Sequence, residues 1–232
     1  MSVHAETSLA EVTSEVYFLH TGDTLFYPKS GQRMSVPKLV IFDCDGVLVD
    51  TETQTNSVIS ANLARYGLQL TIEECAELFV GGTIAAVEQR ARAMGCVLPF
   101  DWIDEIYAEQ FAVLERGVGV IPGVIDILDR LDAASIRYCV GSNGPMAKMK
   151  ITLKPSGLWR RFEGRIFSPH VIGMEYAKPA PGLFLHAARA MGVEPEDSVV
   201  IEDSYSGACA ALAAGMRCFG YCAETPRQKI VL

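Results

Sequence analysis

The chain of 232 residues lacks a long apolar run, a basic cluster and a leader-like N-terminus. No segment approaches the roughly 20 apolar residues that a helix needs to cross a bilayer, and no basic region is followed by an apolar one near the N-terminus. These absences predict a cytoplasmic protein with no membrane partner. Its 20 Lys and Arg residues are outnumbered by 28 Asp and Glu residues, for a net charge of −8. Without a basic run, the composition argues against a nucleic-acid partner.

Paired cysteines and metal-spaced histidines are also absent. The seven cysteines form no C-x-x-C motif and several lie inside apolar runs, which predicts buried, reduced thiols. Cys44 lies between two aspartates, but no histidine is near it and alternating residues of an extended segment point apart, so packing is favoured over a nucleophilic role. His170 and His186 lack metal-ligand spacing and are interpreted as structural or exposed.

What the chain does have is a set of short apolar segments that alternate with helical patterns. Half of the residues are apolar, enough for a sizeable core. Leu39–Phe42 is typical of a buried parallel strand. Similar segments follow at 136–140, 198–201 and 216–221, with a weaker one at 165–167. Helical periods separate them, which predicts an α/β fold: a Rossmann-like parallel sheet with helices on both faces.

Residues 51–117 differ, because they show helical periods without a convincing strand. Thr71 and Glu74 have the spacing of a capping box. We therefore expect an α-helical cap at 51–117, inserted into a core formed by 37–50 and 118–232, with glycine-containing crossings that serve as hinges. Residues 1–36 carry no clear period. They are interpreted as an N-terminal extension, disordered or non-native, with no part in the chemistry.

Polar side chains follow three of the predicted strands. Ligands bind beyond the carboxyl ends of parallel strands, so these side chains are expected to converge. Lys178 lies in a loop just before a predicted helix and is expected to join them. The residues at the strand ends are Asp43, Asp45, Ser142, Asn143, Glu202 and Asp203.

Carboxylates gathered at one sheet edge repel one another, and a divalent cation relieves that repulsion. Oxygen-only ligands suit Mg²⁺, which also shares its sites with phosphate. We expect Asp43 and Asp203 to bind the ion directly, and Glu202 to bind it directly or through water. The backbone carbonyl of Asp45 completes the predicted metal site.

A phosphoryl group beside such an ion needs positive charge and hydrogen-bond donors. Lys178 supplies charge, Ser142 a hydroxyl and Asn143 a backbone N–H. Asp43 is the predicted nucleophile, which forms an acyl phosphate, and Asp45 is the predicted acid and then base. Asp50, Thr51 and Glu52 follow the first strand and are candidates to line the cap entrance, but helix capping explains Asp50 and Thr51 at least as well. Gly82, in a glycine pair before a cap helix, is predicted to bend over the phosphate.

These motifs, in this order, resemble those of the haloacid dehalogenase superfamily, in the branch with a helical cap between the first two motifs. The likeness spans roughly Lys38 to Cys222. Members that cleave carbon–halogen bonds lack the second aspartate, so Asp45 implies phosphoryl transfer. The matching segments are Asp43–Asp50, Gly141–Asn143, Lys178–Pro179 and Ile201–Ser204.

Within the superfamily, Ser142–Pro145 followed by Lys148-Met149 is similar to beta-phosphoglucomutase and the sugar-phosphate phosphatases, including phosphogluconate phosphatase. The resemblance implies a Mg²⁺-dependent phosphatase that acts on a small phosphorylated metabolite, a sugar phosphate or sugar-acid phosphate, through an aspartyl phosphate. A monomer is expected, with a homodimer as the alternative. The rival functions are a phosphomutase with the same residues and an inactive binding module. Some relatives carry a substrate-reading lysine where this chain has Val80, so the substrate is left open.

Overall fold

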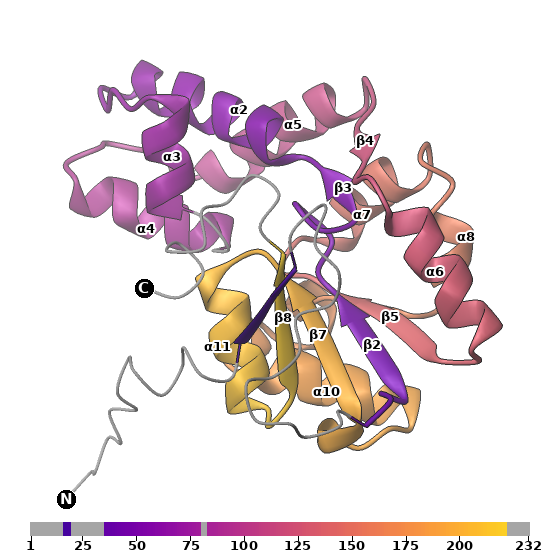
Figure 1. The fold of residues 1–232 in the computed structure, drawn as a ribbon. Helices are drawn as coiled ribbons and strands as arrows, with labels where there is room; N and C mark the ends of the chain where they lie inside the picture. The colour runs from indigo at the N-terminus through magenta and orange to yellow at the C-terminus, as the bar shows by residue number, and fades with distance from the viewer. Residues whose placement is uncertain (1–15, 20–34, 80–82, 222–232) are drawn as a thin grey trace, which may run out of the picture.

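The sheet of this protein is parallel throughout. The computed structural model describes residues 16–19, 35–79 and 83–221. Six strands form the sheet in the order β1-β8-β7-β2-β5-β6, and every pairing is parallel (Figure 1). The predicted α/β class is confirmed. The strands are β1 Val16–Leu19, β2 Leu39–Phe42, β5 Arg137–Gly141, β6 Ile166–Phe167, β7 Ser198–Glu202 and β8 Arg217–Tyr221.

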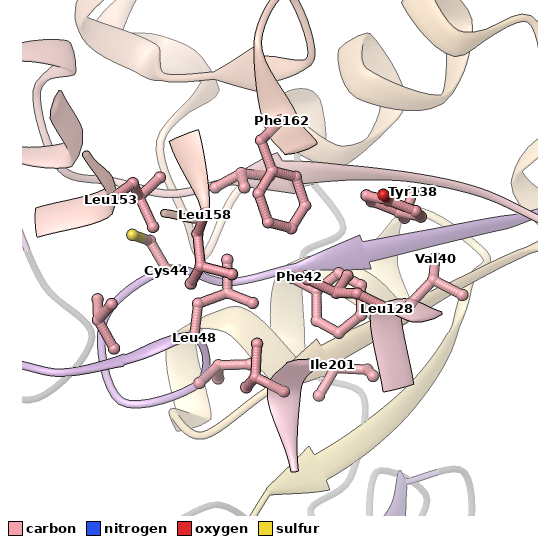
Figure 2. Packing of buried hydrophobic residues seen from close by; sticks show 14 of the residues in the cluster. Val40, Phe42, Cys44, Leu48, Leu128, Tyr138, Leu153, Leu158, Phe162 and Ile201 are labelled. Atoms are coloured by element: carbon pink, nitrogen blue, oxygen red, sulfur yellow. The ribbon is translucent and has the colours of Figure 1, made fainter. Parts of the chain in front are cut away.

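Helices cover both faces of the sheet, because side chains along each central strand alternate between two apolar clusters. Leu39 and Ile41 of β2 pack on one face with Phe184 and the alanines of α11. Val40 and Phe42 pack on the other with α6, α7 and α8, where Phe162 meets Phe42 edge-on at 6.2 Å (Figure 2). The elements beside the sheet are α6 Val124–Ala133, α7 Met146–Leu153, α8 Trp159–Phe162, α9 Pro169–Ile172, η1 Met174–Tyr176, α10 Gly182–Met191, η2 Pro195–Asp197 and α11 Tyr205–Ala213.

A second helical layer lies above the carboxyl ends of the strands (Figure 1). Its members are α2 Glu52–Arg65, α3 Ile72–Phe79, α4 Ile84–Ala93 and α5 Trp102–Leu114. They share an apolar cluster of their own around Leu63 and Trp102. The predicted capping box is confirmed: Thr71 N donates to Glu74 Oε2 at 2.7 Å, and Glu74 N donates to Thr71 Oγ1 at 3.1 Å. This layer coincides with the segment proposed as the cap.

The two crossings between the layers pair with each other. β3 (Val49–Asp50) and β4 (Gly119–Val120) form a short antiparallel ribbon. The sequence predicts hinges here but not the pairing, because each partner is only two residues long and the two lie about 70 positions apart. The ribbon ties the start and the end of the helical layer together.

Part of the segment 1–36 belongs to the sheet, which the sequence does not predict. The backbone of Val16–Leu19 pairs with β8, from Val16 opposite Cys218 to Leu19 opposite Tyr221. An edge strand pairs with only one other strand. A four-residue run without a surrounding period does not show in the sequence that it forms such a strand or which strand it pairs with. Residues 1–15 and 20–34 lie outside the described residues.

Two further expectations from composition concern the helices and the thiols. None of the helices in the described ranges is long and apolar enough to cross a membrane. Among the described cysteines, Cys44, Cys75, Cys96, Cys139 and Cys218 are buried free thiols, and Cys209 is partly buried.

Candidate active site

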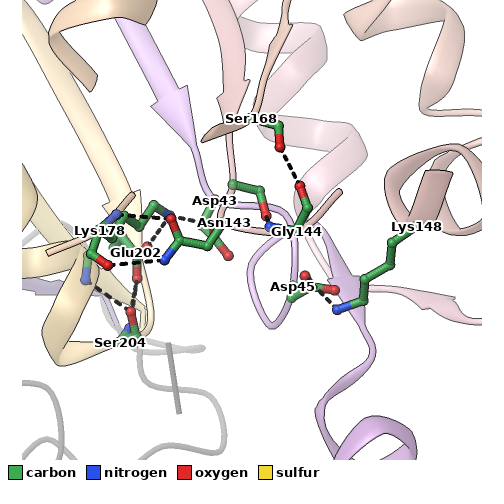
Figure 3. Close-up of polar contacts among 11 residues, drawn as sticks. Asp43, Asp45, Asn143, Gly144, Lys148, Ser168, Lys178, Glu202 and Ser204 are labelled. Carbon is green, nitrogen blue, oxygen red and sulfur yellow. Dashed lines mark hydrogen bonds and ion pairs between the residues drawn. The ribbon is translucent and has the colours of Figure 1, made fainter. Parts of the chain in front are cut away.

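One lysine bridges two acids at the carboxyl end of the sheet. Lys178 Nζ lies 2.5 Å from Asp43 Oδ1 and 2.5 Å from Glu202 Oε1 (Figure 3). Asp43 directly follows β2, and its N–H donates to the carbonyl of Ile201, so that the ladder between β2 and β7 fixes its backbone. Lys178 is 5% exposed and Glu202 is 1% exposed. The contacts join residues that are 135 and 24 positions apart in the chain.

Asn143 holds the backbone of Lys178 in place. The Lys178 N–H donates to Asn143 Oδ1 at 2.9 Å, and Asn143 Nδ2 donates to the Lys178 carbonyl at 3.2 Å. The side-chain amide of Asn143 is therefore committed to the lysine loop. Burial disfavours the charge on Lys178, but Asp43 and Glu202 outweigh it and raise the pKa of the ammonium group.

Both carboxylate oxygens of Glu202 accept hydrogen bonds. Oε1 accepts from Lys178, and Oε2 accepts from the N–H and the hydroxyl of Ser204, each at 2.8 Å. The Ser204 hydroxyl also accepts from Gly207 N, which caps α11. A Cβ at Gly207 would lie 1.9 Å from Glu202, so a glycine is required at this position. The sequence places Ser204 in a motif but does not reveal that it orients Glu202.

Three buried acids stand close enough to hold one ion. Ligand oxygens of Asp43, Glu202 and Asp203 all lie within 4.8 Å of one another. Burial, reinforced by Glu202 and Asp45 and opposed by Lys178, raises the pKa of Asp43 to about 7. Burial and Glu202 also raise the pKa of Asp203. An all-oxygen set whose members resist ionisation in one another's presence fits a hard divalent cation such as Mg²⁺.

Gly46 allows the turn after β2 to pass close to the side chain of Asp203. Its φ is +75°, and a Cβ there would lie 2.0 Å from Asp203 Oδ2. Any side chain would therefore both strain the backbone and displace a carboxylate of the acidic cluster. The glycine after the second aspartate is thus part of the site's construction.

Asp45 is held separately from the acidic cluster. Thr51 Oγ1 donates to Asp45 Oδ1 at 2.6 Å, and Lys148 Nζ lies 2.8 Å from Asp45 Oδ2. Burial opposes ionisation of Asp45, but Lys148 and Thr51 outweigh it and lower the pKa of Asp45. Thr51 is the N-cap residue of α2 but its side chain makes no capping bond, so the interpretation of that side chain as a helix cap is wrong. Lys148 is not predicted as a site residue, because nothing local marks one lysine of α7 as facing the strand ends.

Ser142 directly follows β5 and is 2% exposed. Its Oγ accepts from Gly144 N at 3.1 Å, and Ser168 Oγ donates to the Gly144 carbonyl at 2.7 Å, so the loop has a fixed shape. Ser142, Asn143 and Gly144 all line the cavity that contains the acids and Lys178. Gly82, predicted to bend over the phosphate, lies outside the described residues.

The opposite wall of this cavity comes from the helical layer, and apart from Thr51 and Glu52 the sequence does not identify it. Its lining is neutral polar or apolar apart from Glu52. These cap-side residues are Thr51, Glu52, Thr55, Asn56, Ile59, Phe79, Thr83, Ile84, Val87, Tyr107 and Gln110. A helical period shows which residues are buried but does not separate those that face a cavity from those that face a core.

The fold and the site together define an α/β enzyme with a lysine-bridged acidic centre beneath a helical layer. The chain belongs to the haloacid dehalogenase-like hydrolase family, whose model matches residues 37–215. The predicted family and the predicted hydrolase class are confirmed.

Similar proteins include named phosphatases. The chain is 31% identical over 200 residues to the 6-phosphogluconate phosphatase of Escherichia coli K12, an alignment that covers 85% of this chain and 88% of the relative. It is 29% identical over 201 residues to phosphoglycolate phosphatase 1 of Pseudomonas aeruginosa, covering 80% and 71%. A hydrolase of the same family from Deinococcus radiodurans, crystallised with bound phosphate and sodium, superposes with a TM-score of 0.63 at 34% identity, covering 80% of this chain and 81% of that one.

Proposed function

We propose that the protein is a Mg²⁺-dependent phosphatase that releases phosphate from a small phosphorylated metabolite, a sugar phosphate or sugar-acid phosphate, through an aspartyl phosphate. The observation that carries this proposal is the convergence of Asp43, Asp203 and the Lys178–Glu202 pair in one buried site. The names of the relatives, and the phosphate bound by one of them, support the substrate class.

The acidic cluster is the proposed metal site. Asp43, Asp203 and the Asp45 backbone carbonyl would hold Mg²⁺ directly. Both oxygens of Glu202 are engaged by Lys178 and Ser204, which favours contact with the ion through water. When bound, the ion neutralises the charge that otherwise keeps a carboxylate nucleophile and a phosphate dianion apart.

The chemistry divides between the two aspartates. A carboxylate oxygen of Asp43 forms a bond to phosphorus while the bond from phosphorus to the leaving oxygen breaks. Asp45, in its protonated form, gives a proton to that leaving oxygen and becomes a carboxylate. It then takes a proton from a water molecule that attacks the acyl phosphate, which releases inorganic phosphate and restores the Asp43 carboxylate.

Three residues stabilise the transferred group. The Lys178 ammonium faces the charge that develops on the phosphoryl oxygens, and its two short contacts fix it there before substrate arrives. The Ser142 hydroxyl and the Asn143 backbone N–H act as phosphate donors. Because these groups are already positioned by β5 and the lysine loop, little reorganisation accompanies the reaction.

The helical segment 51–117 is the proposed cap, which selects the substrate and excludes water, and 37–50 with 118–232 is the proposed core. Gly82, which precedes α4 by two positions in the sequence, remains a proposed phosphate-side residue. A cytoplasmic monomer is part of the proposal, and gel filtration tests the oligomeric state.

A panel of phosphorylated metabolites tests the function. We expect the protein to release inorganic phosphate from one or more sugar or sugar-acid phosphates with Mg²⁺, and not with excess chelator. Formation of glucose 6-phosphate from beta-glucose 1-phosphate, without free phosphate, would show a mutase instead. Absence of both activities across the panel would contradict the proposal.

A further inference from the structure

Two lysines line the described part of the cavity, and only one is used by the mechanism above. Lys178 pairs with the proposed nucleophile, and Lys148 pairs with the proposed acid and base, Asp45 (Figure 3). The Lys148 side chain is 12% exposed and that of Asp45 is 25% exposed. Water and salt screen the attraction between Lys148 and Asp45 less than they screen a surface ion pair. The interaction energy of this pair therefore depends more strongly on its geometry.

The position of Lys148 is determined by the packing around α7. Met149 and Leu153 of this helix are fully buried in the apolar cluster beside β2, which fixes the backbone. The lysine stem passes Gly144: a Cβ there would lie 3.6 Å from Lys148 Cδ and 3.6 Å from Asp45 Oδ2. The loop after β5 therefore runs alongside the lysine stem and the carboxylate that the ammonium group reaches.

Both oxygens of Asp45 are engaged, each by a different partner. Thr51 holds Oδ1 and Lys148 holds Oδ2. A carboxylate held at both oxygens cannot rotate freely about its terminal torsion. Acid–base catalysis requires the carboxyl oxygen to lie within hydrogen-bond reach of both the leaving oxygen and the attacking water, so this restraint bears on catalysis directly.

We propose that Lys148 is a positioning residue for Asp45: it fixes the orientation of the carboxylate that serves both half-reactions, without itself contacting the reacting atoms. The inference rests on the proposed phosphatase function. It differs from a substrate-binding role for Lys148, which would act on KM and would not depend on Asp45.

A double-mutant cycle separates these roles. Lys148→Met, Asp45→Ala and the combined variant are compared with wild type on the best substrate from the panel, with Lys150→Met as the matched control on an exposed position of the same helix. We expect Lys148→Met to lower kcat by about 10²-fold, at the lower end of general acid–base effects, with KM within about twofold. The combined variant should be no slower than Asp45→Ala, because the positioned group is already absent.

Lys148→Arg provides the second readout and guards against a folding defect. It keeps the charge and a donor, so we expect it to recover about tenfold of the kcat lost in Lys148→Met, with thermal midpoints close to wild type for all variants. Lys150→Met should match wild type. Additive losses in the cycle, or a rise in KM at unchanged kcat, would overturn the positioning role while leaving the phosphatase intact. An inactive wild type would instead reject the proposed function.

Discussion

The two walls of the cavity differ in chemistry. The core wall carries Asp43, Lys178, Glu202 and Asp203, whose carboxylates and ammonium group lie against one another, and Asp45, which pairs with Lys148. The cap wall contributes hydroxyls, amides and apolar side chains, with Glu52 as its acid. This difference is what the proposed function requires, with bond making assigned to one layer and substrate selection to the other.

The walls are also stabilised by different means. The core wall is formed at the ends of strands whose side chains are buried on both faces of the sheet. The cap has its own apolar cluster and a polar contact at its centre, where Trp102 Nε1 donates to Asn62 Oδ1 at 2.7 Å. Changes in one wall are therefore expected to leave the fold of the other intact, and the following experiments test that separation.

The largest effect is expected on the core wall. Asp43→Asn removes the nucleophile but preserves its volume, so kcat should fall by about 10⁴-fold or more, since an amide does not form the acyl phosphate. Steady-state phosphate release measures this loss. Asp126→Asn, an exposed carboxylate on α6, is the control and should leave kcat unchanged. Retention of more than a few per cent of activity in Asp43→Asn would reject the assignment.

Metal removal should cause the next largest loss of activity. Excess chelator is expected to lower activity by about 10²-fold or more, with recovery on adding Mg²⁺. Because the proposed ion would relieve repulsion among three buried acids, Mg²⁺ should also raise the thermal midpoint of wild type in a concentration-dependent way. Asp203→Asn should weaken that stabilisation. Equal stabilisation of this variant and wild type would place the ion elsewhere.

A change in the cap wall should alter selection more than chemistry. Gln110 lines the cavity from α5 and is 3% exposed. Gln110→Leu removes its polar group at similar volume, so KM should rise by about tenfold while kcat stays within about threefold. Gln89→Leu, on an exposed face of α4, is the matched control. If Gln110→Leu lowers kcat and leaves KM alone, the division between the walls fails.

The smallest effect on turnover is expected inside the cap. Asn62→Leu leaves the buried Trp102 N–H without its acceptor, which should lower the free energy of unfolding by about 1–3 kcal/mol. Chemical denaturation measures this change, and kcat well below the melting temperature should remain near that of wild type. A large loss of kcat in a fully folded variant would show that the cap centre is coupled to the chemistry.

The same contrast between walls explains how far the sequence predicts the site. Asp43, Ser142 and Glu202 lie at the ends of short apolar strands, and a parallel sheet brings such ends to one edge. Local pattern and topology together are therefore sufficient to place them. Lys178 follows from its loop before a helix, although its bridging contact to Asp43 spans 135 positions.

The cap wall and the partners of Asp45 depend on how separate layers pack. Gln110 and Tyr107 occupy a helix whose period predicts burial, but only the docking of α5 over the strand ends turns them toward a cavity. Lys148 is one of several lysines in the chain, and its role depends on the packing of α7 that brings its ammonium group to Asp45. The strand Val16–Leu19 likewise becomes recognisable only when its pairing with β8 is known.

The covalent intermediate tests the central claim most directly. Enzyme mixed with a labelled substrate and quenched in acid within one turnover should carry one phosphoryl group on the peptide that contains Asp43, and Asp43→Asn should carry none. A label on any other peptide, or full turnover with no labelled protein at any quench time, would contradict the account.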